Sequence, residues 1–491
     1  MYWIAKLFST PPPASMDGCH FEIERAPRHS ACRTWLTKIV TFPFTLPERI
    51  YNTYLLFKHG ELREPAAKNM CPFKVLSPFR TLFFSFNLTR NLDLMKAILH
   101  HPRKNPDTGL FNDQDNKLVF LFLVRELFPH DLIEERDSLL TCLKEDLFFH
   151  RQPILQFLTP SKIKATSKEL VGIAHDVVSL CCNSKKEINA AELSFTFTTT
   201  VISRLLLGHP GPIKKYQEIS LALDCLNRIA IKKAWHIKLS SQEAIEYQVA
   251  LATIRQAIEQ VLDNQEKPPL GSLVEMLQKS MTPTQVKVAL FNLFFAGSET
   301  AASLLTYMFW QLGRNSHYQE IIQKELSQDD DLFQAVESSE TLSRVYVESI
   351  RLFSPGYVIS RRAAVDLVCR ARNSQDAVVF EQRIPAGEAL MSTPTFAARD
   401  PSKFYNPDKF DPDRFEQLPK SLDWRPFGDG AHSCPGQTLA KYEVLVLAAY
   451  FIRNFTFVSF PEKEIGQKGL LTLKPVEEVT LMIIPRSEKA I

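Results

Sequence analysis

Cys434 stands in a segment whose residue types suit a metal-binding thiolate, FGDGAHSCPG at residues 427–436. The glycines favour a tight loop in which backbone N–H groups can turn toward the sulfur. A proline follows Cys434, and apolar residues recur at helical spacing over residues 439–449, which predicts a helix. A helix N-terminus favours the charged form of a thiol, and a thiolate on haem iron promotes O–O cleavage. The competing interpretation is a buried structural cysteine.

A second candidate is the segment AGSET at residues 296–300, inside the longest helical pattern of the chain. Glycine in the middle of a helix is unfavourable by about 1 kcal/mol, so it often marks a close approach. A threonine hydroxyl can bond the backbone carbonyl one turn earlier and open a kink that admits water. Taken alone, the segment is equally consistent with an ordinary packed helix that leaves Glu299 on a solvated face.

A third candidate is the pair Glu348 and Arg351, three residues apart in a helical stretch. Side chains at this spacing share one face of a helix and can form an ion pair. Taken alone, this is an ordinary surface pair. A proline-rich segment, PDKFDPDRF at residues 407–415, supplies another arginine, Arg414, before the Cys434 loop.

The Cys434 loop resembles the haem-binding loop of the cytochrome P-450 superfamily, F-x-x-G-x-[RH]-x-C-x-G, with every fixed position present. Chance agreement is on the order of one in ten thousand per chain at ordinary residue frequencies. The resemblance implies that Cys434 ligates the iron, that Phe427 shields the sulfur and that His432 approaches a haem propionate. The remaining fixed positions are Gly430 and Gly436.

Residues 296–300 resemble the oxygen-binding groove of the same superfamily, [AG]-G-x-[DE]-T. This resemblance implies that Ala296 and Gly297 leave room above the iron. It also implies that Glu299 and Thr300 relay protons to iron-bound dioxygen.

The E-x-x-R pattern of Glu348 and Arg351, followed by Arg414, resembles a helix and a proline-rich segment of the superfamily. The resemblance implies a buried charged triad behind the haem. Bidentate arginine geometry can satisfy such a carboxylate, and losing one member would strand a buried charge. The triad would be structural rather than catalytic.

Arginines that bind the haem propionates are also implied. Residues 360–366, SRRAAVD, resemble the strand after the E-x-x-R helix, and within it we favour Arg361 over Arg362. The superfamily has a W-x-x-x-R helix near residue 150, where this chain offers Arg151 but no tryptophan. Pro153 is expected to disturb that helix. A surface-exposed Arg151 is therefore the alternative.

The resemblance and the patterns together predict a mainly α protein with a small β part, the cytochrome P-450 fold, as one large domain around haem. Thr282 and Gln285 form a capping-box pattern at the start of a helix that runs to about Leu312. A helix that long and apolar must cross the middle of a large domain.

Other elements follow from the same patterns. Residues 132–278 indicate successive helices with breaks at Pro153, at residues 208–212 and at residues 267–269, and residues 365–385 and 470–485 indicate short strands. We divide the chain into an irregular extension at residues 1–60 and a haem-thiolate domain at residues 61–491.

Composition excludes several classes of protein. The net charge is only +3 over 491 residues and no like-charge run occurs, so we expect no nucleic-acid partner. The nine cysteines form no C-x-x-C pair, which argues against a zinc site or a disulfide framework and favours a reducing compartment. We expect no transmembrane span and a cytoplasmic location, with peripheral membrane contact through residues 1–60 as a further hypothesis.

The leading functional hypothesis is a monooxygenase that inserts one atom of dioxygen into a hydrophobic, lipid-like or terpenoid small molecule. The apolar residues Leu293, Phe294 and Phe295 lie beside the groove segment. The expected cofactor is haem b (iron protoporphyrin IX), and electrons would come from a separate ferredoxin or flavoprotein reductase. The alternatives are a haem-thiolate peroxygenase, a hydroperoxide isomerase or dehydratase, and a non-catalytic haem sensor. The intact pair of Glu299 and Thr300 argues against them.

Overall fold

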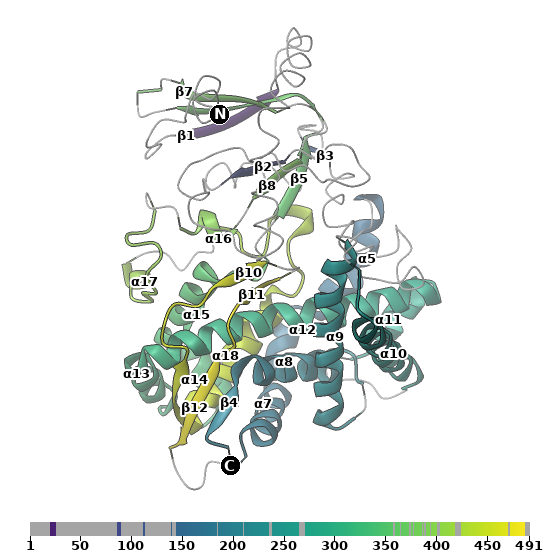
Figure 1. Cartoon of the computed structure of the whole chain (residues 1–491), viewed down its shortest axis with the longest axis vertical. Helices are drawn as coiled ribbons and strands as arrows, with labels where there is room; N and C mark the ends of the chain where they lie inside the picture. Colours follow the sequence, from purple (N-terminus) through teal and green to yellow (C-terminus); the bar gives the residue numbers. More distant parts are fainter. Residues whose placement is uncertain are drawn as a thin grey trace.

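Two of the described sheets lie apart from the helices. The computed structural model describes three short strands and Leu139 before residue 144 and, with short internal gaps, residues 144–486. In Figure 1 the strands β7, β1, β2, β8, β5 and β3 lie at one end, and the helices fill the other. This arrangement confirms the predicted class, mainly α with a small β part. The predicted boundary at residue 60 lies outside the described residues.

The helical part begins at residue 144 and continues to residue 454. In chain order its helices are α5 (Lys144–Phe157), α6 (Pro160–Ala165), α7 (Ser167–Cys182), α8 (Ala190–Thr200), the π-helical segment η5 (Val201–Leu206), α9 (Ile213–Ala234), α10 (Ser241–Asp263), α11 (Leu273–Ser280), α12 (Pro283–Arg314), α13 (Ser316–Leu326), α14 (Leu332–Ser338), α15 (Glu340–Leu352), α16 (Pro394–Ala397), α17 (Arg414–Gln417), the 3₁₀ turn η6 (Gly430–His432) and α18 (Gln437–Asn454).

Helix α12 forms the centre of this part, and Figure 1 shows it running across the helical layer. It begins with the predicted capping box, in which Thr282 Oγ1 accepts from Gln285 N at 3.3 Å and Gln285 Oε1 accepts from Thr282 N at 2.9 Å. Helices α8, α15 and α18 and strand β9 (Phe455–Phe460) all pack against it. Among the described helices only α12 is long and apolar enough to cross a membrane, and 83% of its most apolar window is buried inside the protein.

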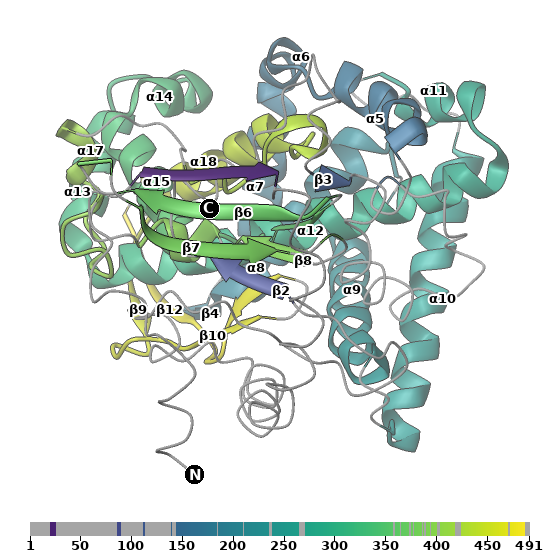
Figure 2. The ribbon, with the colours of Figure 1, turned by 90° about the horizontal axis from the view of Figure 1, so that it is seen from above.

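The described strands form four small sheets. Two lie at the strand-rich end, with orders β1-β6-β7 and β2-β8-β5-β3, and two lie against the helices, with orders β4-β12-β9 and β10-β11. Figure 2 shows β1, β6 and β7 side by side. Among the described strands, only the pair β2 and β8 is parallel. The remaining bounds are β1 (His20–Arg25), β2 (Phe86–Thr89), β3 (Phe111–Asn112), β4 (Glu187–Asn189), β5 (Ile359–Ala363), β6 (Leu367–Arg372), β7 (Val378–Ile384), β8 (Ala389–Ser392), β10 (Gln467–Gly469), β11 (Leu473–Pro475) and β12 (Thr480–Pro485).

One predicted break is wrong. Helix α5 continues through Pro153, although proline removes a backbone donor and crowds the preceding turn. The helix persists because its apolar side is held in the core, with Ile154 and Phe157 almost fully buried. The break predicted at residues 208–212 is confirmed, since η5 ends at Leu206 and α9 begins at Ile213.

Candidate active site

The loop before α18 turns back on itself to present Cys434. Gly428 and Gly430 have φ values of +70° and +71°, a region that side chains with a Cβ rarely adopt. The N–H of Cys434 donates to the carbonyl of Phe427 at 2.7 Å, which closes the loop. Gly428 and Gly430 are therefore required by backbone conformation, and the closing bond fixes where the sulfur emerges.

The environment of the Cys434 thiol contains opposing influences. The side chain is exposed on one side, while protein crowds it on the others. Burial raises the pKa of the thiol; the backbone N–H of Gly436 and the charge of Arg151 oppose that rise, and Glu443 adds to it. A Cβ on Gly436 would lie 3.8 Å from Cys434 Sγ, so the backbone at this position passes close to the sulfur. The protein thus supplies part of the positive potential that a thiolate needs.

Arg151 reaches the same loop from helix α5. Its Nη2 donates to the carbonyl of Ser433 at 2.6 Å, although the two residues are 282 positions apart. The side chain is half-buried, so the alternative of a surface-exposed arginine is wrong. The next residue, His150, is buried. The guanidinium therefore connects α5 to the residue that precedes Cys434.

The middle of α12 presents different residues on different sides. Ala296 is exposed, and the Thr300 hydroxyl donates to the Ala296 carbonyl at 2.8 Å, the one-turn interception expected from the sequence. Gly297 is close to another helix rather than to open space, because a Cβ there would lie 2.5 Å from Ile202 Cδ1 of η5. The small size of Gly297 thus serves helix packing, and Ala296 and Thr300 mark the open side of the helix.

Glu299 is buried, with 2% of its surface exposed, which excludes the alternative of a solvated face. Its Oε1 lies 2.5 Å from Lys474 Nζ of β11 and accepts a hydrogen bond from Asn227 Nδ2 of α9. Glu299 and Thr300 therefore have separate partners, as expected for successive residues of a helix. The predicted pair is present, but its two members point to different neighbours.

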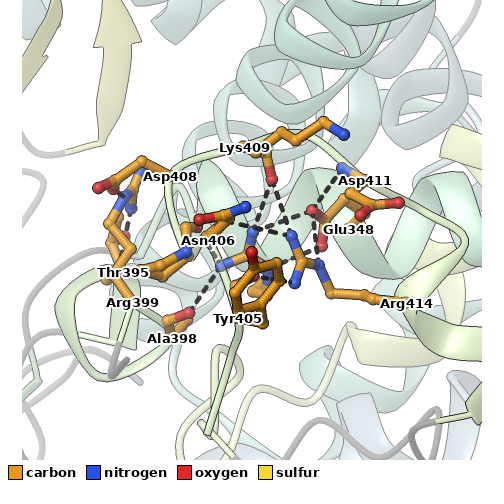
Figure 3. A network of polar contacts seen from close by, with 12 residues as sticks. Glu348, Thr395, Ala398, Arg399, Tyr405, Asn406, Asp408, Lys409, Asp411 and Arg414 are labelled. Carbon is orange, nitrogen blue, oxygen red and sulfur yellow. Dashed lines mark hydrogen bonds and ion pairs between the residues drawn. The ribbon is translucent and has the colours of Figure 1, made fainter. Parts of the chain in front are cut away.

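Glu348, Arg351 and Arg414 lie together. Figure 3 shows Glu348 beside Arg414 and Asp411. Arg351 donates to the Glu348 carboxylate through Nε at 2.6 Å and Nη2 at 2.9 Å, a bidentate pair with both side chains fully buried. Arg414 adds a third donor, Nε at 3.2 Å from Glu348 Oε1. The backbone N–H of Asp411 donates to the same oxygen at 2.8 Å.

The remaining donors of the two arginines bind backbone carbonyls, so this network also fixes the chain between α15 and the Cys434 loop. Arg351 Nη1 donates to the carbonyls of Ala398 and Pro407 at 2.8 and 2.7 Å. Arg414 Nη1 donates to Tyr405 O at 2.7 Å, and Nη2 donates to Lys409 O at 3.0 Å. Every contact is structural, and none is directed at a reacting group.

The structure describes less of the surroundings of two other predicted site residues, Arg361 and His432. Arg361 lies in β5, where its backbone pairs with Leu390 of β8, but its side chain is outside the described residues. His432 is half-buried and ends the 3₁₀ turn before Cys434. The sequence did not indicate Lys474 or Asn227, the partners of Glu299. Only the burial of Glu299 reveals the need for a cation, and no spacing encodes it.

A model of the cytochrome P-450 family matches residues 128–480, which contain every segment of this site described above. The chain belongs to the cytochrome P-450 family. Thromboxane-A synthase of Sus scrofa is 28% identical over 248 residues, 48% of this chain and 44% of that protein. Abscisic acid 8'-hydroxylase 1 of Oryza sativa subsp. japonica is 34% identical over 179 residues, which are 36% of this chain and 37% of that protein. A nicotine N-demethylase of Nicotiana tomentosiformis is 28% identical over 217 residues, which are 41% of this chain and 40% of that protein. The aligned segments span less than half of each relative.

The residues of this P-450 site fit a haem-thiolate centre. Crowding by protein disfavours a free Cys434 thiolate, and a metal ion at the accessible sulfur would supply the missing positive charge. Gly436 and Arg151 already act in the same direction. Helix α12, which carries the open side formed by Ala296 and Thr300, packs against α18. The family implies the haem, and these residues are suited to hold and complement it.

Proposed function

We propose that this P-450 is a monooxygenase that inserts one atom of dioxygen into a hydrophobic small molecule. The observation that supports this best is the open side of α12, where the Thr300 hydroxyl lies one turn from the exposed Ala296. A hydroxyl that can pass a proton, on a helix packed against α18, the helix that follows the Cys434 loop, serves the cleavage of dioxygen. A haem protein that only senses or carries a ligand has no use for it.

Each residue then has a defined task. Haem b, when bound, would supply the oxygen-activating chemistry. Cys434 Sγ would hold the iron, while the Gly436 N–H and the Arg151 guanidinium stabilise negative charge on the sulfur. The Thr300 hydroxyl would pass a proton from its position at the Ala296 carbonyl. A separate ferredoxin or flavoprotein reductase would deliver the two electrons.

For the substrate, lipid-like and terpenoid compounds are our first candidates. Phe294 and Phe295 are core residues, with Phe295 stacked on Phe291 at 6.4 Å between ring centroids, so neither lines an open surface. Leu293 is half-buried, so of Leu293, Phe294 and Phe295 it remains the candidate for contact with a hydrophobic substrate. The relatives are named as a synthase, a hydroxylase and an N-demethylase. A panel of hydrophobic ligands, screened by the shift of the haem spectrum, would select the substrate for turnover assays.

The proposed role of Thr300 can be tested with a matched variant on the same helix. Thr306 makes the same bond as Thr300, from Oγ1 to the carbonyl four residues earlier at 2.8 Å, but it is buried in the core. With NADPH and a surrogate reductase, Thr300→Val should keep consuming electrons while product per NADPH falls at least about tenfold and hydrogen peroxide rises. Thr306→Val should leave this ratio unchanged.

Peroxide-driven turnover of the same variants separates the alternatives. It bypasses protonation of dioxygen, so Thr300→Val should lose much less activity in this assay. An equal loss in both assays would mean that Thr300 only shapes the pocket. Wild-type protein that turns over with peroxide but never with NADPH and a reductase would instead be a peroxygenase.

A further inference from the structure

Helix α8 reaches the backbone of α12 in the middle of the candidate site. The Thr198 hydroxyl of α8 donates to the carbonyl of Ser298 at 2.7 Å, although the two residues are 100 positions apart. Ile202, one turn after Thr198, lies so close to α12 that a Cβ on Gly297 would be 2.5 Å from its Cδ1. Figure 1 shows α8 beside α12, and the two helices pack against each other. Two successive residues of α12 are thus contacted at their backbone from one face of α8 and η5.

Ser298 belongs to the buried side of α12. It has no exposed surface, whereas Ala296, two residues earlier, is exposed. Residues two positions apart in an α-helix point about 200° apart around its axis. Thr198 is also fully buried. It therefore contacts α12 from behind the open side, through a bond to the backbone rather than to a side chain.

Thr198 and Thr300 modify the same turn of α12 from two sources. Thr300 donates to the Ala296 carbonyl at 2.8 Å from within the helix. Thr198 donates to the Ser298 carbonyl from another helix. A carbonyl oxygen has two lone pairs, so each carbonyl can keep its helical partner as well. A second donor draws the carbonyl outward and lengthens the helical bond, which bends a helix locally. Since α12 is helical throughout Pro283–Arg314, the two hydroxyls adjust this turn without breaking it.

The bond of Thr198 differs from that of its neighbour Thr200. The Thr200 hydroxyl donates within its own helix, to the Thr196 carbonyl at 2.7 Å. Thr198 has a similar local choice in the Phe195 carbonyl at 3.3 Å, but the Ser298 carbonyl is closer at 2.7 Å. A distance of 2.7 Å is typical of a good O–H···O bond, and 3.3 Å is long for one. The contact between the helices is therefore the principal bond of this hydroxyl.

We propose that Thr198 is a positioning residue for the oxygen-activating site, because its bond to the Ser298 carbonyl sets the place of the turn that carries Ala296 and Thr300. This inference rests on the proposed monooxygenase function, in which Thr300 passes a proton from its place at the Ala296 carbonyl. Thr198 is buried behind α12, so it acts only through the backbone of that helix. It extends the functional site to α8.

Loss of this bond has a defined consequence for the open side of α12. The Ser298 carbonyl would return to the line of its helical hydrogen bonds, and the turn would relax toward a straight helix. Ala296 and Thr300 would shift together, because both belong to that turn. The Thr300 hydroxyl would remain present but displaced. Coupling between electron use and product should therefore fall in part, and less than when the hydroxyl itself is removed.

The first test needs no turnover. The C–O stretching band of the ferrous carbon monoxide complex depends on the polarity and the donors of the pocket beside the haem. Thr198→Val keeps the size of the side chain without the hydroxyl, so this band should shift from its wild-type position. Thr198→Ser keeps the hydroxyl and should leave the band in place. Thr200→Val removes a buried hydroxyl that is bonded within α8, so it is the matched control and should not move the band.

The second test measures coupling with NADPH and a surrogate reductase. One hydrogen bond typically changes an equilibrium by about two- to tenfold, so product per NADPH should fall by about that factor in Thr198→Val. Thr198→Ser and Thr200→Val should match wild type. In a Thr300→Val background, adding Thr198→Val should reduce coupling no further, because Thr198 acts through Thr300. A residue with only a structural role would not show this dependence.

Thermal unfolding separates positioning from general damage to α8. Thr198→Val and Thr200→Val both replace a buried hydroxyl by a methyl group, so both should keep Tm within about 4 °C of wild type. If Thr198→Val does not fold, Thr198→Ala and Thr198→Ser replace it in both tests. These two variants differ only by the hydroxyl, so the alanine variant should shift the band and lose coupling relative to the serine variant.

A Thr198→Val protein with either the wild-type band or wild-type coupling would overturn the inference. An equal band shift in Thr200→Val, or a further loss when Thr198→Val is added to Thr300→Val, would overturn it as well. Failure of the proposed function looks different. In that case wild-type protein itself would yield no product with NADPH and a reductase, while the carbon monoxide band would still show whether Thr198 positions α12.

Discussion

Glu348→Gln would break the buried charged network while keeping the shape of the side chain. The carboxylate accepts two bonds from Arg351, one from Arg414 and one from the Asp411 N–H. Glu348 and Arg351 are fully buried, and only 7% of the Arg414 side chain is exposed. The variant would leave two guanidinium groups facing a neutral amide, one half of which is itself a donor.

The cost follows from this burial. Removing one partner of a buried ion pair typically costs about 3–5 kcal/mol, a large share of the roughly 5–15 kcal/mol that stabilises a folded protein. Arg351 would keep its bonds to the carbonyls of Ala398 and Pro407, which places the expected loss toward the lower end. Glu348→Gln/Arg351→Met also removes one of the two stranded charges, so its loss should be smaller than the sum of the two single losses.

Urea denaturation of the purified variants would measure the loss of unfolding free energy, and their haem content would show whether the haem is retained. A surface pair gives the control: Glu416 is 56% exposed and bonded to Arg344, so Glu416→Gln should cost less than about 1 kcal/mol. Glu348→Gln protein that retains full haem and unfolds within about 1 kcal/mol of wild type would refute the reasoning.

Three further outcomes follow from single residues. Gly297→Ala should lower the free energy of unfolding, measured by urea denaturation, by about 1–3 kcal/mol, because its Cβ would overlap the Ile202 side chain. Adding Ile202→Ala should restore part of that stability. A Gly297→Ala protein as stable as wild type would contradict the close approach of the two helices. Burial, aided by Lys215, lowers the pKa of His209 from 6.5 to about 4, so the unfolded chain binds a proton that the folded chain does not. The unfolding free energy should therefore fall by about 3 kcal/mol from pH 7 to pH 4, and His209→Gln should reduce this pH dependence. If the pH dependence of His209→Gln equals that of wild type, His209 is not its source. Cys434→Ser should abolish the long-wavelength band of the ferrous carbon monoxide complex, and survival of the band would identify a different ligand.

Local patterns were sufficient where the physical cause is local. The start of α12 follows from hydrogen bonds among neighbouring residues, Thr282 and Gln285, and the structure has the same capping box. The pairing of Glu348 and Arg351 follows from their spacing on one helix face. Pro153 shows the limit of such reasoning, because the burial of Ile154 and Phe157 outweighs the local cost of a proline inside α5.

The sequence by itself predicted Cys434 as the candidate ligand and determined the form of its loop, since two left-handed backbone positions at glycines and one cysteine before a helix are local requirements. Tertiary structure alone decided the long-range partners of the site residues. It turned Gly297 toward Ile202, buried Glu299 against Lys474 and brought Arg151 to the Ser433 carbonyl. These contacts join residues far apart in the chain, and burial rather than spacing makes them necessary. A buried carboxylate must find a cation, but which cation it finds depends on how α9, α12 and β11 pack.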